Sequence, residues 1–199
     1  MPGHTILSGE RAQRAVAMLR AVTDILDDAS IRYWLDSGTL LGIVREQRLL
    51  PWDTDMDISV SSDQLPRLME CLPDLRRHGF RVRQRFNPPG DDILAAQSAR
   101  LFKVRNRRWH FFRGDLLLDI FVHYRHGDSY YWGMSCKSSS LRLSSPAAFF
   151  DTLTHIPFEG KRYPAPSDTA LYLTHRYGDW RTPVTRWNCF KDDGALVGV

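Results

Sequence analysis

The sequence predicts an α+β domain in which helices pack against a mixed β-sheet. In the first half, segments with apolar residues at helical spacing alternate with short segments in which every second residue is apolar. Three strand-like segments then follow one another without a helix between them. The chain has 199 residues, 43% of them hydrophobic, and contains no internal repeat or low-complexity linker. We therefore expect a single domain over residues 1–199 with a substantial core.

The first half of the chain contains five predicted elements. Residues 10–28 have an apolar stripe and a polar opposite face, which predicts an amphipathic helix. A short strand is expected over 31–36 and a brief helix over 40–46. The alternation over 54–60 predicts a strand with one buried face. Residues 61–79 begin with cap-like residues and end in His-Gly, so we predict a helix that its second proline ends or bends early.

Strands dominate the rest of the prediction. The segments 80–86, 99–109 and 116–124 are typical of strands in one antiparallel or mixed sheet. Residues 158–166 have hairpin character, and a helix is expected over 167–177. The remainder of the last third is predicted to consist of turns.

Three aspartates occupy alternate positions, at Asp53, Asp55 and Asp57. A strand rises about 3.3 Å per residue, so Asp55 and Asp57 would lie roughly 6.6 Å apart on one face. Two such carboxylates can share a divalent cation, which offsets their repulsion. Asp53 continues the row and is a further candidate ligand. Asp119 interrupts the apolar segment LLLDIFV, where an unpaired carboxylate would cost several kcal/mol to bury, and a shared metal would give it a partner.

The aspartates are also compatible with roles that need no metal. Their row is also compatible with the solvated face of an edge strand, and Asp119 could instead have an arginine partner. A calcium-binding loop is excluded, because Ile58 and Gln64 stand where that loop needs glycine and glutamate. A helix-capping role is better filled by the residues at 61–63.

A small turn, Ser-Gly-Thr at 37–39, lies between a predicted strand and a predicted helix. Backbone N–H groups at such a helix start can bind a phosphate. Gly38 and Gly42 match neither the dinucleotide-binding fingerprint nor the P-loop pattern. The aspartates that follow about fifteen residues later strengthen the interpretation of this turn as a phosphate-binding site.

Several motifs together resemble the LicD family, which includes the fukutin-related proteins. They are GTLLGIVR, PWDTDMDI, LLLDIFVHY, FEGKRYPAPSD and YLTHRYGDW, in the family's order across residues 31–183. The resemblance implies a nucleotidyltransferase fold in which a small turn holds donor phosphates and three carboxylates bind magnesium, or else manganese. The matching positions are Gly38 and Thr39 for the turn, Arg45 for a phosphate-holding arginine, and Asp55, Asp57 and Asp119 for the metal ligands and catalysis. The family's usual proline after D-I-F is missing, which favours a different acceptor pocket.

The resemblance also implies an activity. We expect transfer of a phosphorylated alcohol, such as phosphocholine or ribitol phosphate, from a CDP-linked donor to a hydroxyl of a glycan or polyol-phosphate acceptor. Asp119 is the candidate base. Two alternatives remain: a nucleotidyltransferase that releases pyrophosphate, and a pseudoenzyme that binds nucleotide or glycan without turnover. The retention of three mutually repelling carboxylates argues against the second.

Basic residues alternate with other residues in the strands predicted at 80–86 and 99–109. If the strands pair, like charges face one another, which favours an anion between them; we expect Lys103 and Arg105 to bind substrate phosphate. A solvated surface is the alternative. Aromatic residues at 109–112 could stack on a base, but no RNA-recognition or helix-turn-helix motif accompanies them, so no stable nucleic-acid partner is expected. His123 is a further candidate for contact with the site.

The overall composition indicates the compartment. A net charge of +4 and a pI near 9.1 predict a mild attraction to anions. No apolar run approaches the roughly 20 residues of a membrane-spanning helix, and the N-terminus lacks a secretory pattern. The three cysteines are far apart and odd in number, which predicts a protein of the reducing cytoplasm.

Overall fold

The computed structural model describes residues 6–108, 112–136, 139–184 and 187–197. Its helices are α1 (Gly9–Asp28), α2 (Ser37–Glu46), the 3-10 helix η1 (Ser62–Gln64), α3 (Leu65–Arg77), α4 (Ala148–Asp151) and α5 (Thr169–Tyr177). Its strands are β1 (Tyr33–Leu35), β2 (Met56–Ser61), β3 (Phe80–Phe86), β4 (Ala99–Arg108), β5 (Phe112–His126), β6 (Ser129–Cys136), β7 (Ser139–Pro146), β8 (Leu153–Phe158) and β9 (Lys161–Pro166).

The larger sheet has the strand order β1-β2-β5-β4-β3, and β6 and β7 extend it from the C-terminal end of β5. Strands β2 and β5 are parallel, whereas the other pairs are antiparallel. Strands β8 and β9 form a separate hairpin that contacts β1. The predicted α+β arrangement with a mixed sheet is confirmed.

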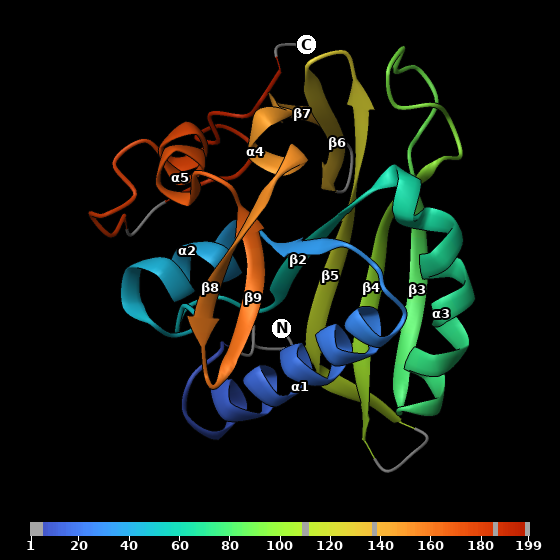
Figure 1. Ribbon diagram of the computed structural model, residues 1–199, viewed down its shortest axis with the longest axis vertical. Coiled ribbons are helices and arrows are strands. Elements are labelled where there is room, and N and C mark those ends of the chain that lie inside the picture. The colour runs from blue at the N-terminus through green and yellow to red at the C-terminus, as the bar shows by residue number, and fades with distance from the viewer. Residues whose placement is uncertain (1–5, 109–111, 137–138, 185–186, 198–199) are drawn as a thin grey trace.

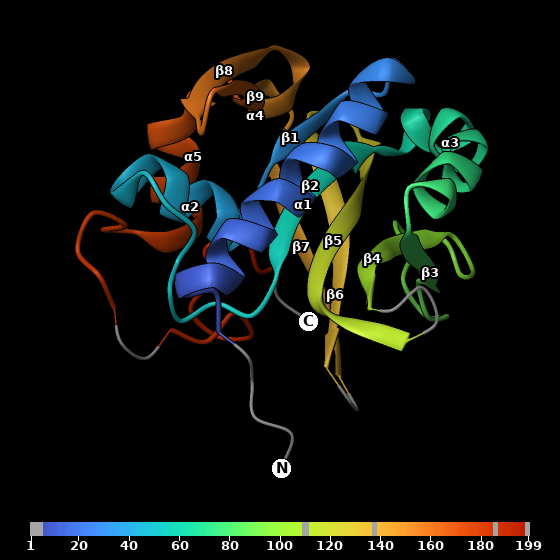
Figure 2. The same ribbon diagram turned by 90° about the horizontal axis from the view of Figure 1, so that it is seen from below.

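Helices α1 and α3 lie on one side of β3, β4 and β5 (Figures 1 and 2). The side chains that these strands direct into the core, such as Phe102, Val104 and Leu118, are fully buried. Because successive strand residues alternate between faces, Lys103 and Asp119 belong to the opposite face. Helices α2 and α5 and the β8–β9 hairpin lie beside β1 and β2 (Figure 2). The part of this face that carries the carboxylates therefore lies between α2 on one side and the strands β4 and β3 on the other.

One helix is longer than its proline predicts. Pro66 lies in the first turn of α3, as expected, but Pro73 does not end the helix, which continues to Arg77. Pro73 is exposed, and the carbonyl that lacks its N–H partner belongs to Met69, whose side chain is 46% exposed. Water can replace the missing hydrogen bond on this outer face, so the prediction that Pro73 ends the helix is wrong.

The second half contains more regular structure than predicted. Strands β6 and β7 and helix α4 occupy a region for which turns were expected, and β5 runs from Phe112 to His126, beyond the predicted 116–124 chiefly at its N-terminal end. Residues 37–39, predicted as a turn before a helix, form the first turn of α2. The predicted hairpin near 158–166 is confirmed by β8 and β9.

Candidate active site

Three aspartates converge where β2 and β5 run side by side. Asp57 is the register partner of Asp119, and Asp55 immediately precedes β2. One carboxylate oxygen from each of the three lies within 4.8 Å of the others. Carboxylate oxygens are the ligands that magnesium prefers in proteins. The structure thus brings together the three residues predicted as metal ligands.

Burial and mutual repulsion oppose ionisation of this cluster. Burial raises the pKa of Asp57 well above its ordinary value, and the charges of Asp55, Asp53 and Asp119 add to the rise. Burial likewise raises the pKa of Asp53 to about 7, with a further contribution from Asp55. Burial raises the pKa of Asp119 to about 6, although Lys103 opposes the rise. A cation bound among these groups would favour their charged forms.

Asp119 has one satisfied and one unsatisfied oxygen. Its Oδ2 accepts a hydrogen bond from Lys103 Nζ at 2.6 Å, so the basic partner is a lysine and not the arginine that the sequence also allows. Its Oδ1 is buried and finds no hydrogen-bond partner among the described residues. Leaving a buried acceptor without a partner costs about 1–3 kcal/mol. A divalent cation shared with Asp55 and Asp57 would satisfy this atom, so the cluster fits a metal.

The start of α2 faces the same cavity. Ser37 and Gly38 line it, and Ser37 has a φ of 48°, in the left-handed region. Gly38 leaves room for Asp53, because a Cβ at Gly38 would lie only 2.2 Å from Asp53 Oδ2. Asp53 is outside the three-carboxylate group found in the described part of the chain. The structure therefore places this predicted ligand against the start of α2.

Thr39 does not face the cavity. Its side chain is buried, and its Oγ1 accepts a hydrogen bond from the backbone N–H of Asp57 at 2.8 Å. The expectation that Thr39 contacts donor phosphate is not supported by this orientation. Thr39 instead ties α2 to β2 and fixes the backbone that carries Asp57.

A buried ionic network holds α2 in place. Asp36, the N-cap residue of α2, accepts hydrogen bonds from Ser37 N, from the Tyr172 hydroxyl and from Arg176 Nη1. Arg176 also pairs with Asp193 at 2.7 Å. Burial by itself would raise the pKa of Asp36, but the charge of Arg176 and several hydrogen bonds outweigh burial and lower it. The network joins α5 and the C-terminal segment to the first turn of α2.

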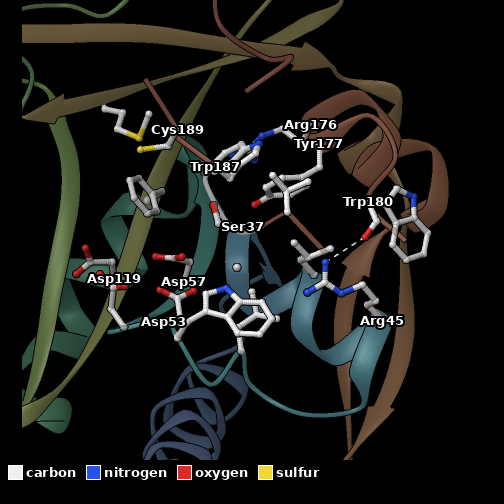
Figure 3. Close-up of a pocket in the computed structure, with 18 of the residues that line it drawn as sticks. Ser37, Arg45, Asp53, Asp57, Asp119, Arg176, Tyr177, Trp180, Trp187 and Cys189 are labelled. Carbon is white, nitrogen blue, oxygen red and sulfur yellow. Dashed lines mark hydrogen bonds between the residues drawn. The ribbon is translucent and has the colours of Figure 1, made fainter. Parts of the chain in front are cut away.

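These elements enclose a cavity of 430 Å³ (Figure 3). Asp53, Asp57 and Asp119 lie on one side of it, and Arg45 and Trp180 lie across from them. The remaining lining is largely apolar and aromatic: Leu41, Leu50, Trp52, Phe121, Met134, Tyr177, Val184 and Trp187. A cavity with an acidic wall and an aromatic wall can hold a metal-bound phosphate beside a flat ring.

Arg45 reaches this cavity as predicted. Its Nη1 donates to the carbonyl of Trp180 at 3.2 Å, and its Nη2 pairs with Glu46 at 2.6 Å. Its guanidinium lies 5.8 Å from the ring of Trp52, and its side chain is only 9% exposed. Arg45 is therefore largely buried in the cavity wall. Glu46 compensates part of the charge of Arg45.

The other predicted substrate-binding residues lie elsewhere. Lys103 and Arg105 line a small hollow on β3 and β4, beyond Asp119. The strands pair so that like charges face one another, with Arg81 opposite Arg105. The aromatic residues Trp109, Phe111 and Phe112 fall outside the part of the chain whose side chains the structure describes.

His123 is not among the residues that line the cavity. It is fully buried, stacked on Trp132 with ring centroids 4.2 Å apart and edge-on to Trp34. Its Nε2 lies 3.5 Å from a carboxylate oxygen of Asp36. His123 therefore lies beside Asp36 and outside the cavity, and neither of its ring nitrogens has a hydrogen-bond partner among the described residues.

The sequence predicted no site role for several lining residues, namely Arg176, Tyr177, Trp180 and Trp187. The first three belong to the motif YLTHRYGDW, which entered the prediction only as part of the family resemblance. In the structure Gly178 follows the end of α5, and Trp180 is buried. The presence of the motif in the family resemblance was the signal that could have placed them at the site. No such signal marks Trp187.

The mixed sheet, the helix that starts beside the cavity and the clustered carboxylates define a domain of the nucleotidyltransferase type. Residues 30–168 match the family model described as LicD/FKTN/FKRP, nucleotidyltransferase domain, and the chain belongs to this family.

Named relatives agree with this assignment. The chain is 24% identical over 178 residues to ribitol-5-phosphate transferase FKTN of Mus musculus, an alignment that covers 88% of this chain and 35% of that protein. It is 24% identical over 98 residues to lipopolysaccharide cholinephosphotransferase LicD of Haemophilus influenzae, covering 47% of this chain and 35% of that protein. The chain thus spans about a third of the length of these relatives.

Among solved structures, that of ANT(2")-Ia in complex with adenylyl-2"-tobramycin aligns with 79% of this chain and 75% of its own, at 16% identity and a TM-score of 0.45. No helix in the described part of the chain has both the length and the apolar character needed to cross a bilayer.

Proposed function

We propose that this chain is a metal-dependent phosphotransferase. It moves a phosphorylated alcohol from a CDP-linked donor to a hydroxyl group of a glycan or polyol-phosphate acceptor, in the cytoplasm. The observation that carries the proposal is the convergence of Asp55, Asp57 and Asp119 on one wall of the cavity, with a buried, unpartnered oxygen on Asp119. The family membership and the names of the two relatives support the type of reaction.

Asp55, Asp57 and Asp119 would hold magnesium, or manganese in its place. When bound, the ion supplies positive charge that stabilises the phosphate oxygens during an in-line displacement. The backbone N–H group of Gly38 would bind donor phosphate, whereas that of Ser37 donates to Asp36. Arg45 would hold a second phosphate oxygen from the opposite wall.

Asp119 would accept the proton of the attacking hydroxyl. Burial raises its pKa in the metal-free chain and a bound cation would lower it again, so this role rests on its position beside the other two carboxylates. Lys103 holds the side chain by its Oδ2, and Oδ1 is the buried oxygen without a hydrogen-bond partner among the described residues. The aromatic wall formed by Trp52, Tyr177 and Trp187 would pack against the donor's base or alcohol.

The test is turnover with magnesium and each of CDP-choline, CDP-ribitol and CDP-glycerol, after a screen of the three donors for thermal stabilisation. Released CMP is expected from at least one donor. Released pyrophosphate from a nucleoside triphosphate, without CMP, would instead identify a nucleotidyltransferase. No magnesium binding at any concentration in a calorimetric titration would favour a pseudoenzyme.

The matched variants are Asp55→Ala/Asp57→Ala and Asp91→Ala/Asp92→Ala. The first removes two of the clustered carboxylates and is expected to lower kcat by about two to three orders of magnitude or more, since losing even one preorganised contact to developing charge costs about 10²–10³. The second removes two carboxylates that pair with Arg142, outside the cavity, and should retain activity. Full metal-dependent turnover in the first variant would refute the assignment.

A further inference from the structure

Charged side chains form a row across four strands, on the face that carries the carboxylate cluster. Asp57 on β2 is the register partner of Asp119 on β5, Asp119 is the partner of Lys103 on β4, and Lys103 is the partner of Arg83 on β3. Register partners project from the same face of a sheet. The row therefore changes from negative to positive between Asp119 and Lys103.

The positive half of the row belongs to a hollow that we call the basic groove. Its lining consists of Arg81, Arg83, Arg85, Lys103 and Arg105, with Leu117 as the apolar member. Arg81 lies opposite Arg105, and Arg83 lies opposite Lys103, so like charges face each other twice. Directly opposed like charges destabilise a strand pair unless an anion lies between them.

The described part of the chain supplies little negative charge to the β3 side of this groove. Lys103 pairs with Asp119, and Arg105 donates to the carbonyl of Gly114 at 3.3 Å and also acts on the charge of Asp119. No ion pair with a described carboxylate involves Arg81, Arg83 or Arg85. Helix α3 packs against the other side of these strands, so the arginine side chains do not face it (Figures 1 and 2). The charges of Arg81, Arg83 and Arg85 are therefore available to an anion from solution.

The size and position of the basic groove limit what that anion can be. The hollow measures 60 Å³, which has room for one small anionic group and not for a nucleotide. Neighbouring strands lie about 4.8 Å apart, so the backbone of Arg83 is roughly 10 Å from that of Asp119. One sugar or polyol unit can span this distance. The groove and the start of α2 lie on opposite sides of the carboxylate cluster, as the acceptor and donor of an in-line transfer must.

We propose that the basic groove binds a phosphate group of the acceptor and thereby places a hydroxyl of the next unit beside Asp119. This inference rests on the proposed function for the identity of the acceptor. The affinity of the groove for phosphate is a property of the folded chain and can be measured without turnover. Lys103 connects the basic groove to the carboxylate cluster, because it lines the groove and donates a hydrogen bond to Asp119.

The probe is glycerol 3-phosphate, with glycerol as its uncharged counterpart, followed through backbone amide chemical shifts of the full chain without divalent cation. Glycerol 3-phosphate is expected to shift amides of β3 and β4, whereas glycerol should not. Arg81→Gln/Arg83→Gln is expected to weaken binding by about tenfold or more, since each arginine removes a charge-assisted hydrogen bond. Arg76→Gln/Arg77→Gln removes the same charge from the exposed end of α3 and should change binding by less than twofold.

Three outcomes of the binding experiment would overturn the proposal. The first is unchanged affinity in Arg81→Gln/Arg83→Gln, shown to be folded by its circular dichroism. The second is displacement of glycerol 3-phosphate by CMP from β3 and β4, which would assign the groove to the donor. The third is arginine-dependent binding of a single-stranded oligonucleotide without binding of glycerol 3-phosphate, which would assign it to nucleic acid.

Kinetics then separates this inference from the proposed function. With an active donor, Arg81→Gln/Arg83→Gln is expected to raise KM for a phosphorylated acceptor about tenfold and to leave KM for the donor unchanged. An equal rise for a non-phosphorylated acceptor would contradict the acceptor-phosphate assignment. If no donor is turned over while phosphate binding depends on the arginines, the phosphate site stands, and its assignment to an acceptor falls together with the proposed function.

Discussion

Gly38 and Asp53 share a space that no larger side chain at position 38 can enter. The Cβ of an alanine there would lie 2.2 Å from Asp53 Oδ2, so Gly38→Ala must displace the carboxylate. We expect this variant to lower the free energy of unfolding by about 1–3 kcal/mol, the range for overpacked sites. Urea denaturation monitored by circular dichroism measures the change.

A double variant identifies the cause of that loss. In an Asp53→Ala background the obstructing carboxylate is absent, so adding Gly38→Ala is expected to be neutral or to stabilise by up to about 1 kcal/mol, because alanine favours a helix over glycine. If the added alanine costs as much as in the wild type, the strain lies in the backbone of α2, and Asp53 does not cause it.

His123 makes stability depend on pH in a predictable direction. Burial lowers its pKa to about 3, whereas an unfolded histidine titrates near 6.5. The unfolded state therefore binds the extra proton below about pH 6.5, and stability is lost as the pH falls. Between pH 7 and pH 5 this histidine is expected to account for about 2 kcal/mol of lost stability. Between pH 7 and pH 5, the free energy of unfolding of His123→Phe should therefore fall by about 2 kcal/mol less than that of the wild type. Urea denaturation at pH 7 and at pH 5 measures both changes.

The exposed residue His155 provides the comparison for this titration, since His155→Phe should follow the wild-type pH dependence. Both variants keep every acidic residue, so losses due to carboxylates cancel when the proteins are compared. A His123→Phe protein with the wild-type dependence would show that the buried ring is already protonated near pH 6.

Single residues differ in how far their roles can be predicted from the sequence. Asp55, Asp57 and Asp119 were predictable, because their spacing on strands and the cost of burying a carboxylate both indicate convergence. The roles of Thr39 and Asp53 were not, because they depend on contacts between α2 and the segment before β2, which spacing does not encode. The pairing of Lys103 with Asp119 was not predictable either, because it depends on which strand lies beside β5.

Helix α2, helix α5 and the C-terminal segment are joined by the buried guanidinium of Arg176, which pairs with Asp36 and Asp193. Arg176→Met would leave both carboxylates buried without their cation. We expect a loss of about 3–5 kcal/mol in the free energy of unfolding, as for other buried pairs that lose one member. Loss of donor binding is expected as well, because Asp36 caps the helix that begins at the cavity.

Arg176→Lys is the matched variant for this prediction. It keeps the charge but lacks the planar fork that reaches two carboxylates at once, so an intermediate loss is expected. Urea denaturation of the three proteins at pH 7 gives the comparison. Equal losses for methionine and lysine would show that the shape of the guanidinium, and not its charge, stabilises this junction.

Elements were predictable where local sequence and tertiary environment agree. Helix α1 has an apolar stripe that packs on the sheet, and its bounds were predicted almost to the residue. Strands β6 and β7 carry a serine-rich stretch with weak local signals, and they form because β6 pairs with the end of β5. Pro73 shows the reverse case, in which solvent exposure lets a helix tolerate a residue that usually ends one.

Negative and positive side chains lie in adjacent regions of the sheet face that carries the site. The chain carries a net charge of +4, yet the cavity concentrates aspartates on one wall, and the basic groove lies beside them. Without a cation, the folded state holds carboxyls whose pKa values burial raises, to about 7 for Asp53 and about 6 for Asp119. Such groups contribute stability that is fully present below about pH 4 and is lost as the pH rises through their folded pKa values.

Metal binding should reverse this loss, and Asp57→Asn provides the test. In metal-free buffer, the wild type is expected to lose stability relative to Asp57→Asn between pH 5 and pH 7.5, because the variant has one fewer buried carboxylate to ionise. At pH 7.5, magnesium at ten times its Kd should stabilise the wild type by about 1.4 kcal/mol. The variant should gain much less, because its amide is a weaker ligand. Urea denaturation with EDTA and with magnesium supplies the four measurements. Equal stabilisation of both proteins would mean that the ion binds elsewhere, and the carboxylate cluster would then lack the role on which the proposed transfer depends.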